Sequence, residues 1–359
     1  MSLSIGIVGL PNVGKSTLFN ALTNNNILAA NYPFATIEPN TGIVPVPDER
    51  LEKLANIYNT TKIIPASVTF VDIAGLVAGA SKGEGLGNKF LANIRQCDAI
   101  VHIVRAFHDD NVIHVSEIIN PRDDIDIINT ELMLADIETL EKHAIKLQKE
   151  SKSDPKKRDE LETLMTIKQS LSEGIIPKSI RCTANHNLKS TLPLLTAKPV
   201  IYAFNVDEDT LASDDKKTAL AKLVSPAKSI FVCAKLEDEI KGLTTSDATE
   251  LLESYGVSET GLLQLIHTAY DILGLQSYLT AGPLEVRAWT IKKGATAPQA
   301  AGVIHGDFER GFIAAEIIDY NDLINSGSKT NARATGKLRT EGKTYIMQPD
   351  DVVEFRFNV

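Results

Sequence analysis

The chain has 359 residues, of which 43% are hydrophobic and 23% charged, the balance of a folded globular protein. Its net charge of −9 excludes a general polycation, so any contact with nucleic acid must come from a local basic patch. The three cysteines, Cys97, Cys182 and Cys233, are few and scattered, which argues against a disulfide framework and against a metal cluster. This length favours two or three domains.

The amino-terminal segment "MSLSIGIVGL" has no basic region and no cleavage-like end. We therefore expect it to form the first core strand, not a signal peptide. No apolar run approaches the roughly 18 residues that would span a bilayer. The sequence accordingly predicts a cytoplasmic protein with no membrane partner, and we expect it to be a monomer.

Strand-like runs rich in Val, Ile and Phe recur along the chain, at 3–9, 67–75, 98–107, 198–206 and 228–234. Helical patterns follow most of them, for example at 15–24, 86–96 and 259–274. Near-continuous apolar strands that alternate with helices are typical of a doubly wound α/β fold with a mostly parallel sheet.

The alternation is interrupted from about 126 to 175, where two helical stripes replace the strands. The first stripe is Ile137, Leu140, Ala144 and Leu147, and the second is Leu161, Leu164, Ile167 and Leu171. Pro155 lies between them and cannot continue a helix. The pattern predicts an inserted antiparallel helical hairpin, because the strand pattern resumes at 198.

A third region begins near 279–286, where Gly282 and Pro283 end the helical pattern. Short β-rich pieces follow, at 284–291, 311–318, 343–348 and 351–357. They predict a small α+β domain. The expected domains are therefore a discontinuous nucleotide-binding domain, a coiled-coil-like insertion and a small carboxy-terminal domain, at 1–125 plus 197–279, 126–196 and 280–359.

The strongest local signal is Gly9–Ser16, which fits G-x4-G-K-[ST] between a predicted strand and a predicted helix. Glycine lets the backbone turn its N–H groups inward, and the helix N-terminus adds positive partial charge. This arrangement cradles a triphosphate, with Lys15 as a catalytic cation on the β- and γ-phosphates. The predicted nucleotide-binding residues here are Asn12, Val13, Gly14, Lys15, Ser16 and Thr17.

A magnesium site is predicted beside this loop. The hydroxyl of Ser16 is one expected Mg²⁺ ligand, and Asp72, at the end of the apolar run "FVDIAG", can hold the metal shell. Thr36 is the candidate third ligand, with Thr41 as the alternative. Gly75 can sense the γ-phosphate, and the glycine-rich segment 75–90 is expected to act as a switch.

The base is expected to contact "NVDE", Asn205–Glu208, and "VCAK", 232–235. In guanine-binding proteins the segment that corresponds to "NVDE" reads N-K-x-D. Here Val206 replaces the Lys and Glu208 replaces the Asp. We therefore expect guanine discrimination to be lost and adenine to be held through its 6-amino group by Asn205 and backbone carbonyls. Cys233 and Ala234 are the expected residues of the base-lining loop. Taken alone, "NVDE" would be interpreted as a plain polar strand end.

Together these segments resemble the YchF/Obg-like ATPases of the Obg-related P-loop GTPase class. The resemblance covers nearly the whole chain, including "GLPNVGKSTLFNALT", "DIAGLVAGASKGEGLGN", the "NVDE" segment and "EVRAWTIKKGATAPQAAGVIHGDFERGFIAAEII". It implies a P-loop NTPase fold with a carboxy-terminal TGS-like domain. It also implies an ATPase that accepts GTP poorly and that associates with ribosomes.

Hydrolysis needs a group that positions the attacking water, and many relatives place a Gln directly after D-x-x-G. This chain has Leu76 there, which cannot hydrogen-bond. His114 is the candidate replacement, because an imidazole can position or deprotonate water, and the resemblance supports it. A histidine packed within a loop is the alternative. Slow intrinsic turnover is therefore expected. Asn12 either binds K⁺ beside the phosphates or only bonds within its loop.

The predicted hairpin turn is basic: residues 140–158 hold seven Lys or Arg against three Asp or Glu. This local excess suits contact with ribosomal RNA, although a solvated helix face is the simpler interpretation. Two functions remain open. One is a nucleotide-switch ATPase that acts on ribosomes. The other is a slow-turnover nucleotide-binding regulator, or a GTPase, of ribosome function.

Overall fold

The computed structural model describes residues 3–24, 40–73, 86–108, 119–177, 192–240 and 242–358. They divide into two compact units. Of the described residues, unit 1 holds those up to 24, 40–42 and those from 69 to 265. Unit 2 holds 43–68 and 266–358.

The first sheet has six strands, in the order β2 (Thr41–Pro45), β4 (Ser67–Asp72), β1 (Ser4–Val8), β5 (Ala99–Ala106), β6 (Val200–Val206) and β7 (Lys228–Val232). All pairings from β4 to β7 are parallel. On the edge, Asp72 N donates to Asn40 O and Val46 N to Ala66 O, the pattern of an antiparallel neighbour. The five predicted strand runs and the mostly parallel sheet are thus confirmed.

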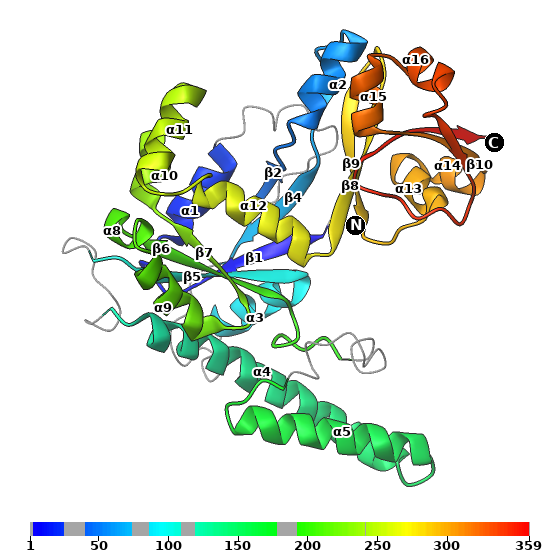
Figure 1. The fold of residues 1–359 in the computed structure, drawn as a ribbon. Helices are drawn as coiled ribbons and strands as arrows, with labels where there is room; N and C mark the ends of the chain where they lie inside the picture. Colours follow the sequence, from blue (N-terminus) through cyan, green and yellow to red (C-terminus); the bar gives the residue numbers. More distant parts are fainter. Residues whose placement is uncertain are drawn as a thin grey trace. The chain divides into compact units, whose positions relative to one another are not determined.

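The helices that connect these strands include α1 (Lys15–Asn24), α3 (Leu86–Gln96), α8 (Glu208–Leu211) and α9 (Asp214–Val224), and the helices that follow the last strand, β7, are α10 (Ala234–Ile240), α11 (Thr245–Ser254) and α12 (Gly261–Ile272). Figure 1 shows them around the first sheet. The bounds of α1 and α3 are the predicted ones. The helix predicted over 259–274 is shorter, because Gly274 adopts a positive φ of 66° and strand β8 begins at Leu275.

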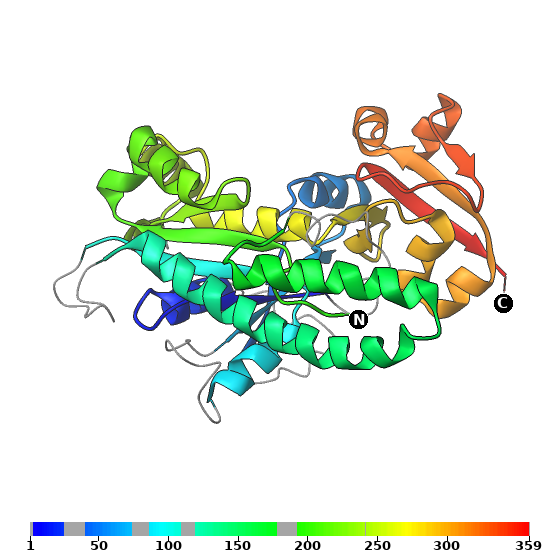
Figure 2. The ribbon, with the colours of Figure 1, turned by 90° about the horizontal axis from the view of Figure 1, so that it is seen from below.

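The predicted helical hairpin is confirmed by α4 (Pro121–Glu150) and α5 (Pro155–Ser172), which lie side by side (Figure 2). Pro155 is the first residue of α5, and the Asp154 side chain caps that helix by accepting from Lys156 N. Both predicted stripes lie in the seam between the two helices. Although α4 has 30 residues, no helix in the described ranges is long and apolar enough to cross a membrane.

Unit 2 contains the second sheet, in the order β11 (Arg339–Glu341), β10 (Phe312–Asp319), β12 (Asp351–Phe357), β8 (Leu275–Ala281), β9 (Val286–Lys292) and β3 (Ile63–Ile64). Its helices are α2 (Arg50–Tyr58), α13 (Ala297–Ile304), α14 (Gly306–Arg310), α15 (Tyr320–Ser326) and α16 (Lys329–Ala334). Tyr278, Phe312 and Met347 are among the buried residues of its core. The predicted small α+β domain is confirmed.

Two features of unit 2 differ from the sequence-based expectation. Residues 343–348 form no strand and make only an isolated bridge, between Thr296 and Ile346. Residues 43–68 supply α2 and β3, and β3 pairs with β9 through Ile63 and Val286. An amino-terminal segment thus completes the carboxy-terminal sheet. The three-domain boundaries remain a prediction beside this two-unit division.

One polar side chain lies in the middle of the first sheet. His102, on β5, is 1% exposed, and its Nε2 has no hydrogen-bond partner within the described residues. Its ring lies 5.3 Å from that of Tyr202 on the adjacent strand. Burial, with a smaller contribution from the positive charge of Lys15, lowers the pKa of His102 to about 3. The imidazole is therefore neutral in the folded protein.

We predict that this histidine makes stability depend on pH. The unfolded chain takes up a proton on His102 near pH 6.5, whereas the folded chain does not until about pH 3. The associated stability is complete above pH 6.5 and is lost as the pH falls toward 3. Urea melts should therefore show wild type losing about 2 kcal/mol more than His102→Leu between pH 7.5 and 5. Parallel curves for the two proteins would contradict the prediction.

Candidate nucleotide site

The loop between β1 and α1 turns tightly because of its two glycines. A Cβ on Gly9 would lie 2.7 Å from the carbonyl oxygen of Ile103, so only glycine allows β5 to approach this closely. Gly14 has a φ of 96°, in the region that favours glycine, and Asn12 has a φ of 61°, which asparagine tolerates. The backbone therefore curls around the N-terminus of α1, as the motif predicts.

Asn205, at the end of β6, fixes this loop from the side. Its side chain is 7% exposed, and its Nδ2 donates to the carbonyl oxygen of Val13 at 3.1 Å. A Cβ on Gly14 would lie only 2.5 Å from that nitrogen. Asn205 was predicted to contact the base. The structure shows that its amide nitrogen is bonded to the loop, so it positions the loop.

Lys15 is the buried cation of the site. It is 9% exposed, and its Nζ donates to the carbonyl oxygens of Gly9 at 3.1 Å and Leu10 at 2.9 Å. Burial lowers the pKa of Lys15, and the negative charge of Asp72 opposes that shift. Two neutral carbonyls compensate an ammonium only partly, so an anion that reaches this loop is strongly favoured.

Asp72 ends β4 beside the loop. Its Oδ1 is buried and has no hydrogen-bond partner in the described part of the chain. Burial raises the pKa of this carboxyl, opposed by the charge of Lys15. Ser16 is exposed in the first turn of α1. A buried carboxylate oxygen without a donor, near an exposed hydroxyl, is the oxygen-ligand chemistry that Mg²⁺ prefers, so these residues fit the predicted metal.

Next to the loop lies a cavity of about 430 Å³. Its lining comes from the loop and α1, from the ends of β6 and β7, from α10 and from α12: Gly14, Thr17, Leu18, Asn20, Ala21, Asn205, Val232, Ala234, Lys235, Glu237, Asp238 and Leu262. Four of the predicted nucleotide-binding residues, Gly14, Thr17, Asn205 and Ala234, are thus brought together. The volume is in the range of small-molecule sites.

The residues predicted to contact the base do not all line this cavity. Val206 is 3% exposed and belongs to the hydrophobic core. Glu208 opens α8, and its carboxylate accepts from Lys235 Nζ at 2.5 Å. This hydrogen bond raises the pKa of Lys235, so its ammonium stays charged. Lys235 lines the cavity, which sequence reasoning missed, although it is the last residue of the quoted "VCAK".

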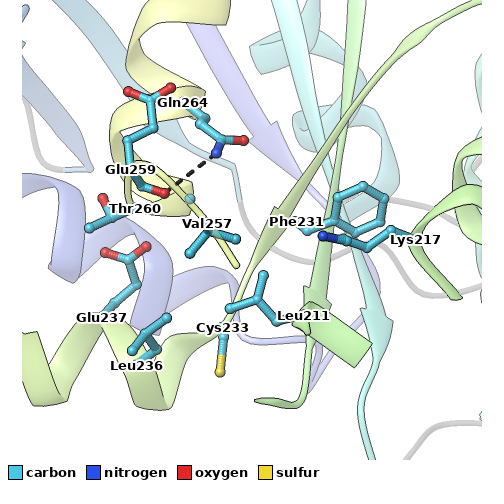
Figure 3. A pocket seen from close by; sticks show the side chains of 11 residues that line it. Leu211, Lys217, Phe231, Cys233, Leu236, Glu237, Val257, Glu259, Thr260 and Gln264 are labelled. Atoms are coloured by element: carbon cyan, nitrogen blue, oxygen red, sulfur yellow. Dashed lines mark hydrogen bonds between the residues drawn. The ribbon is translucent and has the colours of Figure 1, made fainter. Parts of the chain in front are cut away.

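Cys233, predicted to belong to the base-lining loop together with Ala234, does not line the same cavity as Ala234. It is 4% exposed and lines a smaller pocket, of about 100 Å³, together with Leu236 and Glu237 (Figure 3). Burial raises the pKa of the thiol, so Cys233 stays protonated at neutral pH. Glu237 accepts from the backbone nitrogen of Leu262 at 3.0 Å, which ties the base loop to α12. The buried side chain of Cys233 therefore packs beneath the segment 232–235 and does not line the larger cavity.

Several predicted residues lie outside the described residues: Thr36, Gly75, Leu76, Cys182 and His114. Thr41, the alternative magnesium ligand, is the first residue of β2. The metal ligands, the catalytic histidine and a K⁺ site at Asn12 all remain predictions.

We predict that Gly14→Ala weakens Mg·ATP binding by at least about tenfold, or 1.4 kcal/mol. The added Cβ must adopt a positive φ and also displaces the Asn205 amide from the loop. Gly174→Ala is the matched control, because Gly174 has a φ of 76° with nothing within 4 Å of its Cβ position. Calorimetric titration of both variants tests this. Equal affinities would contradict the role assigned to Gly14.

We predict that Asp72→Asn removes the magnesium dependence of ATP binding. In wild type the carboxylate supplies charge to the metal, so adding MgCl₂ should tighten ATP binding. In the variant the ratio of affinities with and without Mg²⁺ should fall to about one. The exposed Asp159→Asn is the control. An unchanged ratio in Asp72→Asn would show that this carboxylate does not hold the metal.

Comparison with known proteins agrees with this geometry. Residues 4–152 match a family described as "50S ribosome-binding GTPase", and residues 275–358 match the YchF GTPase carboxy-terminal family, described as "Protein of unknown function (DUF933)". "Ribosome-binding ATPase YchF" from Bacillus subtilis is 51% identical, and the one from Haemophilus ducreyi 50%, each with full coverage of both chains.

A solved structure of the Schizosaccharomyces pombe YchF GTPase is 39% identical, covers 99% of this chain and 98% of its own, and gives a TM-score of 0.86. Its fold contains the same sequence of a P-loop domain, a helical insert and a small carboxy-terminal domain. The matches extend over nearly the whole chain, so they include both the phosphate loop, Gly9–Ser16, and the segment Asn205–Glu208. The chain belongs to the YchF family, in the Obg-related class of P-loop NTPases.

Proposed function

We propose that this protein is an ATP hydrolase that prefers ATP to GTP and acts as a nucleotide-dependent switch on ribosomes. The buried ammonium of Lys15 on the phosphate loop is the observation that carries the nucleotide part. The ribosome part is supported by the relatives, which are named ribosome-binding ATPases at about half identity over the full length. The protein then acts in the cytoplasm, as a monomer, with no membrane partner.

The preference for adenine follows from the Glu208–Lys235 pair. A guanine-reading carboxylate uses its two oxygens to accept from N1–H and the 2-amino group, whereas one oxygen of Glu208 already accepts from Lys235, so this pair of acceptors is incomplete. Val206 is buried and cannot cover the base as a lysine stem would. Guanine therefore loses its specific acceptor. Adenine instead donates its 6-amino group to Asn205 Oδ1 and to backbone carbonyls of the base loop.

The chain's own groups prepare the triphosphate for attack. The N–H groups at the start of α1 and the ammonium of Lys15 hold the β- and γ-phosphates and offset their negative charge. Ser16, Thr36 and Asp72 would hold Mg²⁺, which supplies further neutralisation of the phosphate oxygens. His114 positions the attacking water in place of the missing Gln, and Asn12 is proposed to hold K⁺.

A second candidate function is a slow regulator, or a GTPase, of ribosome function. Leu76 favours it, because leucine cannot orient water. The description of the matched amino-terminal family as a GTPase also favours it. This alternative keeps tight nucleotide binding but makes hydrolysis secondary to the bound state.

Steady-state turnover with ATP and with GTP, each with and without ribosomes, separates the two functions. The proposal predicts a higher kcat/KM for ATP, stimulation by ribosomes and loss of turnover in His114→Ala with ATP affinity retained. Equal kcat/KM for ATP and GTP would refute the base selectivity. Turnover that neither ribosomes nor His114→Ala changes would favour the regulator.

A further inference from the structure

The turn of the α4–α5 hairpin, residues 146–158, is here called the hairpin tip. In Figure 1 it lies at the end of the hairpin that is away from the sheet of unit 1. Four lysines of the tip, Lys146, Lys149, Lys152 and Lys156, are exposed. The sequence shows a basic run here, and the structure shows which of its charges are available to a partner.

Three of the nearby carboxylates already have partners within the hairpin. Asp154 caps α5 by accepting from Lys156 N at 2.9 Å. Glu160 pairs with Lys157 at 2.7 Å and also lies 3.9 Å from His143. Farther from the turn, Glu141 pairs with Lys168 across the two helices at 2.7 Å. These three carboxylates therefore stabilise the hairpin and form no ion pair with the four exposed lysines. Glu150, the other acidic residue of the tip, is outnumbered by those lysines.

The four exposed lysines make no ion pair within the described ranges. Lys156 lies in the first turn of α5, which carries no acidic residue. A cation at a helix N-terminus opposes the helix dipole, so this placement weakens the helix slightly. A purely solvated helix would favour acidic residues at this position. The charges of the tip thus contribute little to folding.

The tip is held on a rigid base. Leu140, Ala144 and Leu147 of α4 pack against Leu164 and Ile167 of α5, all of them buried. Close to the turn, Ser151 N donates to Leu147 O at 2.8 Å, and Arg158 Nε donates to Ser151 O at 3.1 Å. The backbone that carries the lysines is therefore already ordered, and a partner has to order only their side chains.

We propose that the hairpin tip docks on the phosphate backbone of RNA. The inference rests on the proposed ribosome binding and identifies the surface that would make the contact. Lysines act as point charges that suit phosphate oxygens, and on a chain of net charge −9 they make a local positive field. Residues 146–158 contain no Phe, Tyr or Trp to stack on bases, so recognition is of the backbone.

The test replaces Lys146, Lys149, Lys152 and Lys156 together by Gln. A control variant replaces Lys53, Lys216, Lys222 and Lys228, four exposed lysines elsewhere with the same total charge. Binding to ribosomes by sedimentation, and to a protein-free RNA duplex, is measured from 50 to 200 mM salt. The tip variant should lose at least about tenfold in affinity for both, and the slope of log K against log salt should fall by about 3.

Mg·ATP affinity and circular dichroism should match wild type in both variants. Unchanged ribosome and RNA binding by the tip variant overturns the proposal. Loss of ribosome binding with unchanged binding to protein-free RNA also overturns it, since the tip then contacts a protein. If wild type itself fails to bind ribosomes, the proposed function is refuted, and the affinity for the RNA duplex alone tests the proposal about the tip. Weaker duplex binding by the tip variant than by wild type then supports the proposal, and equal binding refutes it.

Discussion

The buried ammonium of Lys15 is the constraint on which the rest of the site depends. Within the described residues its hydrogen-bond partners are the carbonyls of Gly9 and Leu10, so this largely buried cation forms no ion pair there. Asp72 contributes opposite charge, yet burial raises its own pKa, so each of these two groups is costly to keep charged. This arrangement lowers the stability of the protein without a bound ligand. Binding of a polyanion together with a divalent cation then raises the stability again.

The parallel sheet explains how distant residues meet at this point. Strands β1, β4, β6 and β7 all run in the same direction, so their carboxyl ends share one edge. That edge receives the phosphate loop, Asp72, Asn205 and Ala234 from four separate parts of the chain. The bond from Asn205 to Val13 then links the base end of the site to the phosphate end. The hairpin is inserted between β5 and β6, so it extends from unit 1 without interrupting this edge.

Much of this was predictable from sequence because the signals are local. Apolar strands, the phosphate loop and the two stripes of the hairpin depend on residues close together in the chain. The segment 43–68 was not predictable, because its strand β3 is completed by β9, more than two hundred residues later. Residues 343–348 are rich in β-forming residues, yet they form only a single isolated bridge. The position of "VCAK" after a predicted strand identified the segment that lines the cavity, but it did not predict which of its side chains face that cavity. Lys235 lines the cavity, whereas Cys233 lines the smaller pocket.

The most direct measurement is a crystal structure of the protein grown with Mg²⁺ and a non-hydrolysable ATP analogue. The account predicts a triphosphate within hydrogen-bond distance of the backbone amides at the start of α1. It also predicts that Lys15 Nζ exchanges the carbonyls of Gly9 and Leu10 for phosphate oxygens, with the base in the cavity lined by Asn205 and Lys235. A fully occupied analogue bound elsewhere, with Lys15 still on those two carbonyls, would contradict it.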